Sequence, residues 1–169
     1  MAQGLFITLE GGEGVGKSTQ LRLLHSALES LGIDVLATRE PGGSAGAEEL
    51  RQVLLFGQSQ LCLKAEVLTH FAARFDHVER VIQPALAMGK VVICDRFTDS
   101  TMAYQGYGRA DGRADILHLI STLQNELCCS PDITFLLEAP RDVARLRLAA
   151  RGAPTDRYEL SDEAFHARM

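Results

Sequence analysis

The sequence is short of the features that mark membrane, secreted and nucleic-acid-binding proteins. Among its 169 residues no apolar run approaches the roughly 18 residues of a membrane span. The N-terminal stretch MAQGLFITLE has no basic region ahead of its apolar residues, so we expect no signal peptide. The net charge of −5 lacks the basic excess that non-specific nucleic-acid binding requires. Any anionic ligand must therefore be held by local basic groups.

The cysteines form neither a metal-binding spacing nor a disulfide framework. The sequence contains no CxxC pair, and two of its four cysteines are adjacent. This usage is typical of reduced thiols, so we expect a cytoplasmic protein without a zinc site. The residues concerned are Cys62, Cys94, Cys128 and Cys129.

No internal repeat or linker divides the chain, and short apolar runs alternate with helical patterns. We therefore expect a single domain over residues 1–169, with a parallel sheet between helices in a three-layer α/β/α arrangement. The predicted strands cover residues 6–9, 33–38, 90–96 and 133–137. The predicted helices cover residues 18–31, 47–56, 61–89 with a bend near Pro84, 116–128 and 141–150.

The chain stops at Met169, within a helix that is expected to begin near Ser161. The alternation of strands and helices predicts one further strand and helix in a domain of this type. We therefore expect this last unit to be absent from the chain.

The stretch GGEGVGKST joins the first predicted strand to the first predicted helix. It fits G-x-x-x-x-G-K-[ST], in which glycines let backbone N–H groups surround a phosphate. Lys17 would reach the β- and γ-phosphates of a nucleotide, and the Ser18 hydroxyl would ligate Mg²⁺. The motif predicts a P-loop NTPase-type fold. The predicted cradle comprises Gly11, Gly12, Glu13, Gly14, Val15, Gly16, Lys17, Ser18 and Thr19.

The rest of the sequence narrows the class of P-loop protein. The single asparagine, Asn125, is followed by Glu126, so the Asn-Lys-x-Asp guanine-binding motif of switch GTPases is missing. Motor and transporter ATPases are usually larger. The favoured class is a small kinase that passes the γ-phosphoryl group of ATP to a small acceptor.

Charged residues follow two of the predicted strands at the edge where ligands bind in open α/β sheets. Asp95 and Arg96 end the strand in VVICDRF, and Arg39 follows the second strand. Asp95 would hold Mg²⁺ directly or through water, while Arg96 and Arg39 would hold an acceptor phosphate. An ordinary surface salt bridge is the alternative for Asp95 and Arg96.

The segments GGEGVGKST, TREPGG, HFAARFDH, DRFTDSTMAYQG and ARGAPTDRYE occur in an order and spacing that resembles bacterial thymidylate (dTMP) kinases. The resemblance covers nearly the whole chain. It implies transfer of the γ-phosphate of ATP to dTMP, with Mg²⁺ as cofactor. It also implies a homodimer formed through helices that include parts of 47–88.

The resemblance also implies the residues that hold the acceptor nucleoside. Arg74 reads the thymine edge, Ser100 and Gln105 lie near the base and sugar, and Glu13 lies near the 3′-hydroxyl. The stacking ring is often four residues before the arginine, where this sequence has His70, with Phe71 next. Phe71 is favoured for stacking, although core packing is the commoner role of such a residue.

The P-loop carries Glu13-Gly14-Val15 where some relatives place an arginine, and the migrating phosphoryl group still needs positive charge beyond Lys17. The resemblance implies that in members with this type of loop a lid supplies an arginine. The segment at about 145–158 fits this role. Arg151 is the first candidate and Arg147 the second, and a solvated helix face is the alternative. Two other functions remain open: a kinase for a deoxynucleoside or another nucleoside monophosphate, and a nucleotide-binding fragment without catalysis.

Overall fold

The computed structural model describes residues 4–150, 157–158 and 163–169, and the chain forms two compact units. The first, the sheet unit, comprises residues 1–40, 81–97 and 130–154. The second, the helical unit, comprises residues 41–80, 98–129 and 155–169. The α/β class predicted from the sequence is confirmed by the parallel sheet and its helices.

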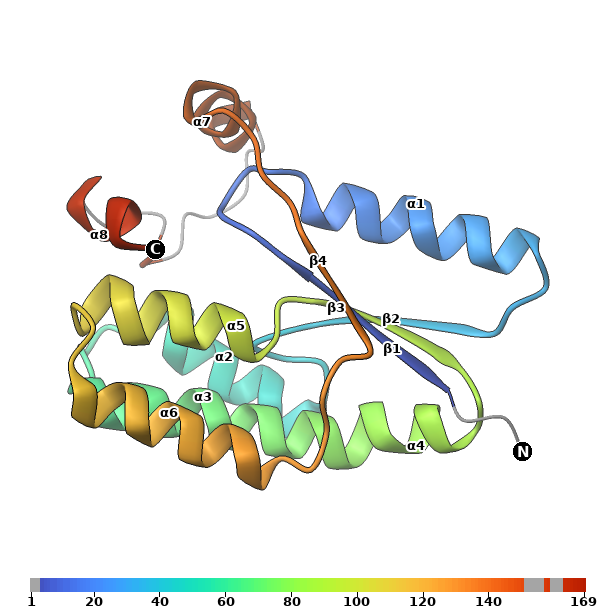
Figure 1. The fold of residues 1–169 in the computed structure, drawn as a ribbon, viewed down its shortest axis with the longest axis horizontal. Coiled ribbons are helices and arrows are strands. Elements are labelled where there is room, and N and C mark those ends of the chain that lie inside the picture. The colour runs from blue at the N-terminus through green and yellow to red at the C-terminus, as the bar shows by residue number, and fades with distance from the viewer. Residues whose placement is uncertain (1–3, 151–156, 159–162) are drawn as a thin grey trace. The chain divides into compact units, whose positions relative to one another are not determined.

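All four strands of the described residues lie in the sheet unit, where Figure 1 labels them. They run parallel in the order β2-β3-β1-β4. Their bounds are β1 Leu5–Glu10, β2 Val35–Arg39, β3 Val91–Asp95 and β4 Ile133–Leu136. The central strands β1 and β3 are mostly buried, and for β3 its continuous apolar run predicts this. The carboxyl ends of β1, β2 and β3 therefore meet at one edge of the sheet.

Three helices of the sheet unit are described: α1 Lys17–Ser30, α4 Gln83–Ala87 and α7 Arg141–Ala150. In Figure 1, α1 and α4 flank the strands on opposite sides. Inside this unit the Phe6 and Phe97 rings pack edge to face, with centroids 5.1 Å apart. Burial of these rings anchors the start of β1 to the residues just after β3.

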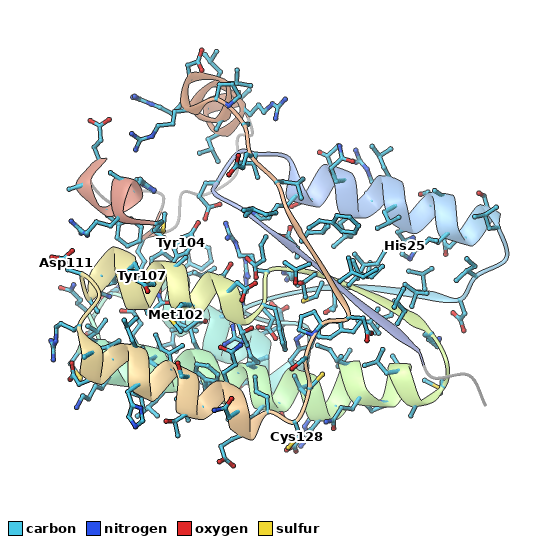
Figure 2. All side chains as sticks on the ribbon, viewed as in Figure 1. His25, Met102, Tyr104, Tyr107, Asp111 and Cys128 are labelled. Carbon is cyan, nitrogen blue, oxygen red and sulfur yellow. The ribbon has the colours of Figure 1, made fainter. Side chains whose placement is uncertain are left out.

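The helical unit contains α2 Ala45–Phe56, α3 Leu63–His77, α5 Thr98–Thr101, the π-helical segment η2 Met102–Arg109, α6 Ala114–Glu126 and α8 Glu163–Arg168. Ser44 caps α2, because its side chain accepts a hydrogen bond from the Ala47 N–H. Figure 2 places Tyr104 on the α5–η2 segment, on the side toward α8, and its ring meets Phe165 edge to face at 5.8 Å.

The structure differs from the sequence-based prediction in two segments. The single bent helix expected over 61–89 is instead α3, a π-helical turn at Val78–Ile82, and α4. Pro84 explains the interruption, because its ring excludes the carbonyl four residues earlier and its nitrogen cannot donate. The second difference is the helical segment over 98–109, for which the sequence had predicted only a motif.

Candidate functional site

The P-loop between β1 and α1 adopts a backbone that only glycine tolerates at several positions. Gly11, Gly14 and Gly16 have φ values of +136°, +73° and +106°. A Cβ atom at Gly11 would strike the carbonyl oxygen of Leu137, and one at Gly14 would strike that of Ala144. The loop therefore combines a left-handed backbone with close approach to the chain around β4 and α7.

Lys17 begins α1 and lies under the loop rather than in solvent. Its ammonium Nζ donates to the carbonyl oxygens of Gly11 at 3.0 Å and Gly12 at 2.7 Å, and the residue is only 6% exposed. Burial, and then the charge of Arg96, lower the pKa of Lys17 from 10.5 to about 8. An anionic phosphate in the cradle would favour the charged form again.

Ser18 and Asp95 join α1 to the end of β3. The Ser18 hydroxyl donates to Asp95 Oδ2 at 2.7 Å. Hydroxyl and carboxylate oxygens are hard ligands that suit Mg²⁺, which usually keeps several waters and takes its remaining ligands from phosphates. The described residues hold no group of three or more His, Cys, Asp or Glu side chains able to bind a metal. The oxygens of Ser18 and Asp95 are of the chemical kind that could hold a magnesium ion together with nucleotide phosphates.

Arg96 directly follows β3 and has a φ of +72°, which is rare for a residue with a side chain. Its guanidinium donates to the Gly11 carbonyl at 3.0 Å and to Glu13 Oε1 at 2.7 Å. Its own N–H donates to the Leu9 carbonyl at 3.0 Å, which holds the strained turn. The guanidinium group of Arg96 therefore contacts the P-loop directly.

Glu10 is a residue of this site that the sequence analysis missed. It is 4% exposed, and its Oε1 accepts a hydrogen bond from the Phe97 N–H at 2.7 Å. The carboxylate thus supports the backbone on the far side of Arg96. A charged residue at the end of an otherwise apolar strand was the available signal.

Arg39 ends β2 and pairs in register with Asp95 of the neighbouring strand. The residue is exposed at this edge of the sheet. Arg147 of α7 also reaches the loop, since its Nη1 donates to the Val15 carbonyl at 3.3 Å. Arg151, the first candidate for the lid cation, lies outside the described residues.

In the helical unit, Arg74 and Phe71 lie together on α3. The Arg74 guanidinium carbon lies 4.8 Å from the centroid of the Phe71 ring, and Arg74 Nη2 donates to Thr101 Oγ1 at 3.0 Å. Phe71 is 1% exposed and Arg74 3%. Phe71 is therefore a core residue in this structure, and its ring supports the Arg74 guanidinium.

His70 and Gln105 meet in a buried polar network that includes Tyr158 and Glu66. His70 Nε2 lies 3.0 Å from the Tyr158 hydroxyl, and Gln105 Nε2 donates to Glu66 Oε1 at 2.9 Å. Burial, and then the charges of Arg74 and Arg157, lower the pKa of His70 to about 3, so the imidazole is neutral. Ser100, in α5, is half-buried in the same unit.

Glu66 and Tyr158 are further residues that the sequence analysis did not select. Glu66, His70 and Arg74 follow each other at four-residue steps, which places them on one face of α3. Three polar residues at this spacing within an apolar pattern were a usable signal. Tyr158 had no such signal, because its partners come from distant parts of the sequence.

None of the helices in the described part of the chain has the length and apolar character needed to span a bilayer. The thymidylate kinase family model matches residues 9–169. Over 167 residues the chain is 56% identical to a thymidylate kinase of Gluconobacter oxydans, covering 99% of this chain and 78% of the relative. It is 52% identical to one of Pseudomonas fluorescens, covering 96% and 76%.

A solved structure gives the same family likeness. The crystal structure of thymidylate kinase from Ehrlichia chaffeensis superposes with a TM-score of 0.73 at 40% sequence identity. The match covers 86% of this chain and 82% of that chain.

Proposed function

The chain belongs to the thymidylate kinase family, and from this premise we propose that it transfers the γ-phosphoryl group of ATP to dTMP, giving ADP and dTDP. It is a nucleoside monophosphate kinase with ATP as the phosphoryl donor. The observation that carries the proposal is the P-loop cradle, in which Lys17, Ser18, Asp95 and Arg96 converge at the carboxyl ends of β1 and β3. This edge is where open α/β sheets bind nucleotides.

In this proposal the residues of the sheet unit have separate roles in phosphoryl transfer. Lys17 and the loop N–H groups hold the β- and γ-phosphates of ATP, with the positive end of α1 beneath them. Ser18 and Asp95 would hold Mg²⁺, which would offset the negative charge of the nucleotide phosphates. Arg39 and Arg96 hold the acceptor phosphate, and Glu13, the ion-pair partner of Arg96, lies near the acceptor sugar. A lid over about 145–158 supplies Arg151 or Arg147 to the migrating phosphoryl group.

The helical unit provides the residues for the thymine base. Arg74 would read the base edge, supported from below by Phe71. Gln105 and Ser100 would contact the base and sugar. We take His70 rather than Phe71 as the ring that would stack on the base, and the Arg74 guanidinium over the Phe71 ring supports this choice. In the same proposal the chain acts as one kinase domain in the cytoplasm, as a homodimer formed through parts of 47–88.

The deciding experiment mixes the chain with ATP and Mg²⁺ and follows ADP release with each of dTMP, dUMP, dCMP, AMP and deoxythymidine. We expect turnover with dTMP to exceed the others. Equal or better turnover of another acceptor would replace dTMP with that acceptor. Binding of ATP and dTMP without turnover would favour a nucleotide-binding fragment.

The lid arginine is tested by Arg151→Ala and Arg147→Ala. Arg145→Ala serves as the control, because Arg145 is exposed on α7 as Arg147 is. Loss of the catalytic cation should lower kcat by about a hundredfold or more, with little change in dTMP affinity. A variant that weakens dTMP binding while leaving kcat intact would contradict the role for that arginine.

A further inference from the structure

We propose that Glu66 is a positioning residue that fixes the amide of Gln105, so that the acceptor site presents an oxygen acceptor to the pyrimidine and prefers thymine to cytosine. The proposal rests on the proposed function, in which Gln105 lies near the acceptor base. Glu66 would not touch the substrate itself. It would instead determine whether Gln105 donates a hydrogen bond to the base or accepts one from it.

Glu66 is a fully buried carboxylate that is held by three donors. Its Oε1 accepts from Gln105 Nε2 at 2.9 Å and from the Tyr158 hydroxyl at 2.8 Å, and its Oε2 pairs with the Arg109 guanidinium. Its exposed fraction is 0%. A carboxylate paired with an arginine is an acceptor and never a donor. Whatever faces it from Gln105 must therefore be the amide nitrogen.

The second contact of Gln105 supports the same orientation of its amide. Gln105 Nε2 also lies 3.1 Å from the Tyr158 oxygen, which accepts because its own proton goes to Glu66. Both N–H groups of the amide are thus engaged. Turning the amide over would set its oxygen against the carboxylate and lose both bonds, in a side chain only 1% exposed where water cannot replace them.

His70 is consistent with this arrangement. Its Nε2 is 3.0 Å from the same Tyr158 oxygen, whose proton is directed to Glu66, so Nε2 is the protonated nitrogen of the ring. The neutral imidazole supplies that single N–H. The Glu66 carboxylate thus fixes the orientation of the Gln105 amide. Through the Tyr158 hydroxyl it also fixes the tautomer of His70.

The chemical consequence concerns the N3 edge of the base. Thymine carries an N–H donor at N3, whereas cytosine carries a lone pair there. An amide held with its nitrogen toward Glu66 directs Oε1 away from it, and this oxygen can only accept. It matches thymine and opposes cytosine, because two acceptors would face each other. Uracil shares the N3–H, so this device does not separate dTMP from dUMP.

The test is Glu66→Gln, with Glu79→Gln as the matched control. A glutamine at 66 can offer either its oxygen or its nitrogen, so Gln105 is free to turn over. Glu79 is exposed in the same unit, so its substitution removes one negative charge outside the network. Binding of dTMP and dCMP is measured by titration calorimetry. We expect the dTMP:dCMP affinity ratio to fall about tenfold in Glu66→Gln and to stay unchanged in the control.

A second variant and a spectroscopic readout keep the proposal falsifiable if Glu66→Gln folds poorly. Tyr158→Phe keeps the ring against Tyr104 but removes one of the two acceptors of the Gln105 amide, so the ratio should fall about threefold. The ¹⁵N-labelled Gln105 side-chain amide should exchange its protons slowly in the wild type and faster in both variants.

A merely structural role for Glu66 would lower the stability and the affinity for both nucleotides together. Folded variants whose dTMP:dCMP ratio stays within about twofold of the wild type would overturn the inference and leave the proposed function standing. A wild-type chain without any preference for dTMP would instead overturn the proposed function. The two failures are therefore distinguishable. Variants that keep the wild-type dTMP:dCMP ratio count against the role of Glu66, and a wild type without a preference for dTMP counts against the proposed function.

Discussion

At the scale of single residues, the buried ammonium of Lys17 is placed to bind phosphate, and its burial lowers the stability of the folded protein. Its position beneath the loop readies it for phosphate, but the unfolded chain holds the proton more tightly than the folded one. Between pH of about 8 and 10.5 the unfolded state binds more protons, so this residue makes the folded protein more stable as the pH rises through that window. Below that window the full penalty remains.

Lys17→Met should therefore raise the free energy of unfolding at pH 7 by about 1 to 3 kcal/mol, because no charge is then buried. The same change should remove phosphoryl transfer. Chemical denaturation and ADP release measure the two effects, with Lys64→Met as the exposed control. A Lys17→Met protein that is less stable than the wild type would contradict the argument.

The same pKa predicts a pH dependence of activity. The free enzyme loses the Lys17 charge as the pH rises through about 8, so kcat/KM for ATP should fall above that value. Bound ATP should return the pKa toward its ordinary value, and kcat should fall only at a higher pH. A kcat/KM profile that stays flat to pH 10 would show that Lys17 is charged throughout.

Asp95 and Ser18 give a residue-scale test of the metal. Asp95→Asn removes one negative charge from the proposed magnesium ligands, so the Mg²⁺ concentration for half-maximal activity should rise about tenfold or more. Asp99→Asn, an exposed change in α5, serves as the control and should leave the Mg²⁺ titration unchanged. An unchanged titration for Asp95→Asn would remove this residue from the metal site.

At the scale of elements, the P-loop and α7 are fitted to each other through glycine. Gly14→Ala forces a Cβ onto the Ala144 carbonyl at a φ of +73°, so we expect a loss of about 1 to 3 kcal/mol in stability and weaker ATP binding. Gly12→Ala is the matched control, because its nearest neighbour would be Val15 Cγ1 at 3.9 Å. Thermal unfolding and ATP titration of both variants test this, and equal behaviour would refute it.

At the scale of the whole molecule, the proposed homodimer draws on apolar side chains left exposed on α2 and α3. Phe56 and Leu68 are 46% and 50% exposed. Leu68→Glu should convert a dimer to monomers, because an interface core excludes an unpaired charge. Leu23→Glu on α1, where Leu23 is 55% exposed, is the control. Sedimentation measures the oligomeric state, and a wild type that sediments as a monomer would reject the dimer.

The sequence by itself determined the features that rest on local pattern. The glycine spacing around Lys17, the continuous apolar run of β3 and the alternation of strands with helices predicted the cradle and the parallel sheet. Helix 141–150 was predicted with the bounds that the structure has, because its residues follow a plain helical period. The family resemblance, confirmed by the comparisons, added the reaction.

Only the tertiary structure decided which distant side chains meet. The sequence could not show that Arg96 turns back to Gly11 and Glu13, or that Glu10 holds the Phe97 N–H, because those contacts span more than eighty residues. The structure also assigned Phe71 to the core beneath Arg74 and joined His70 and Gln105 through Tyr158 to Glu66. Pattern reports which face of an element is buried, whereas the partner of a buried polar group depends on how the chain folds back on itself.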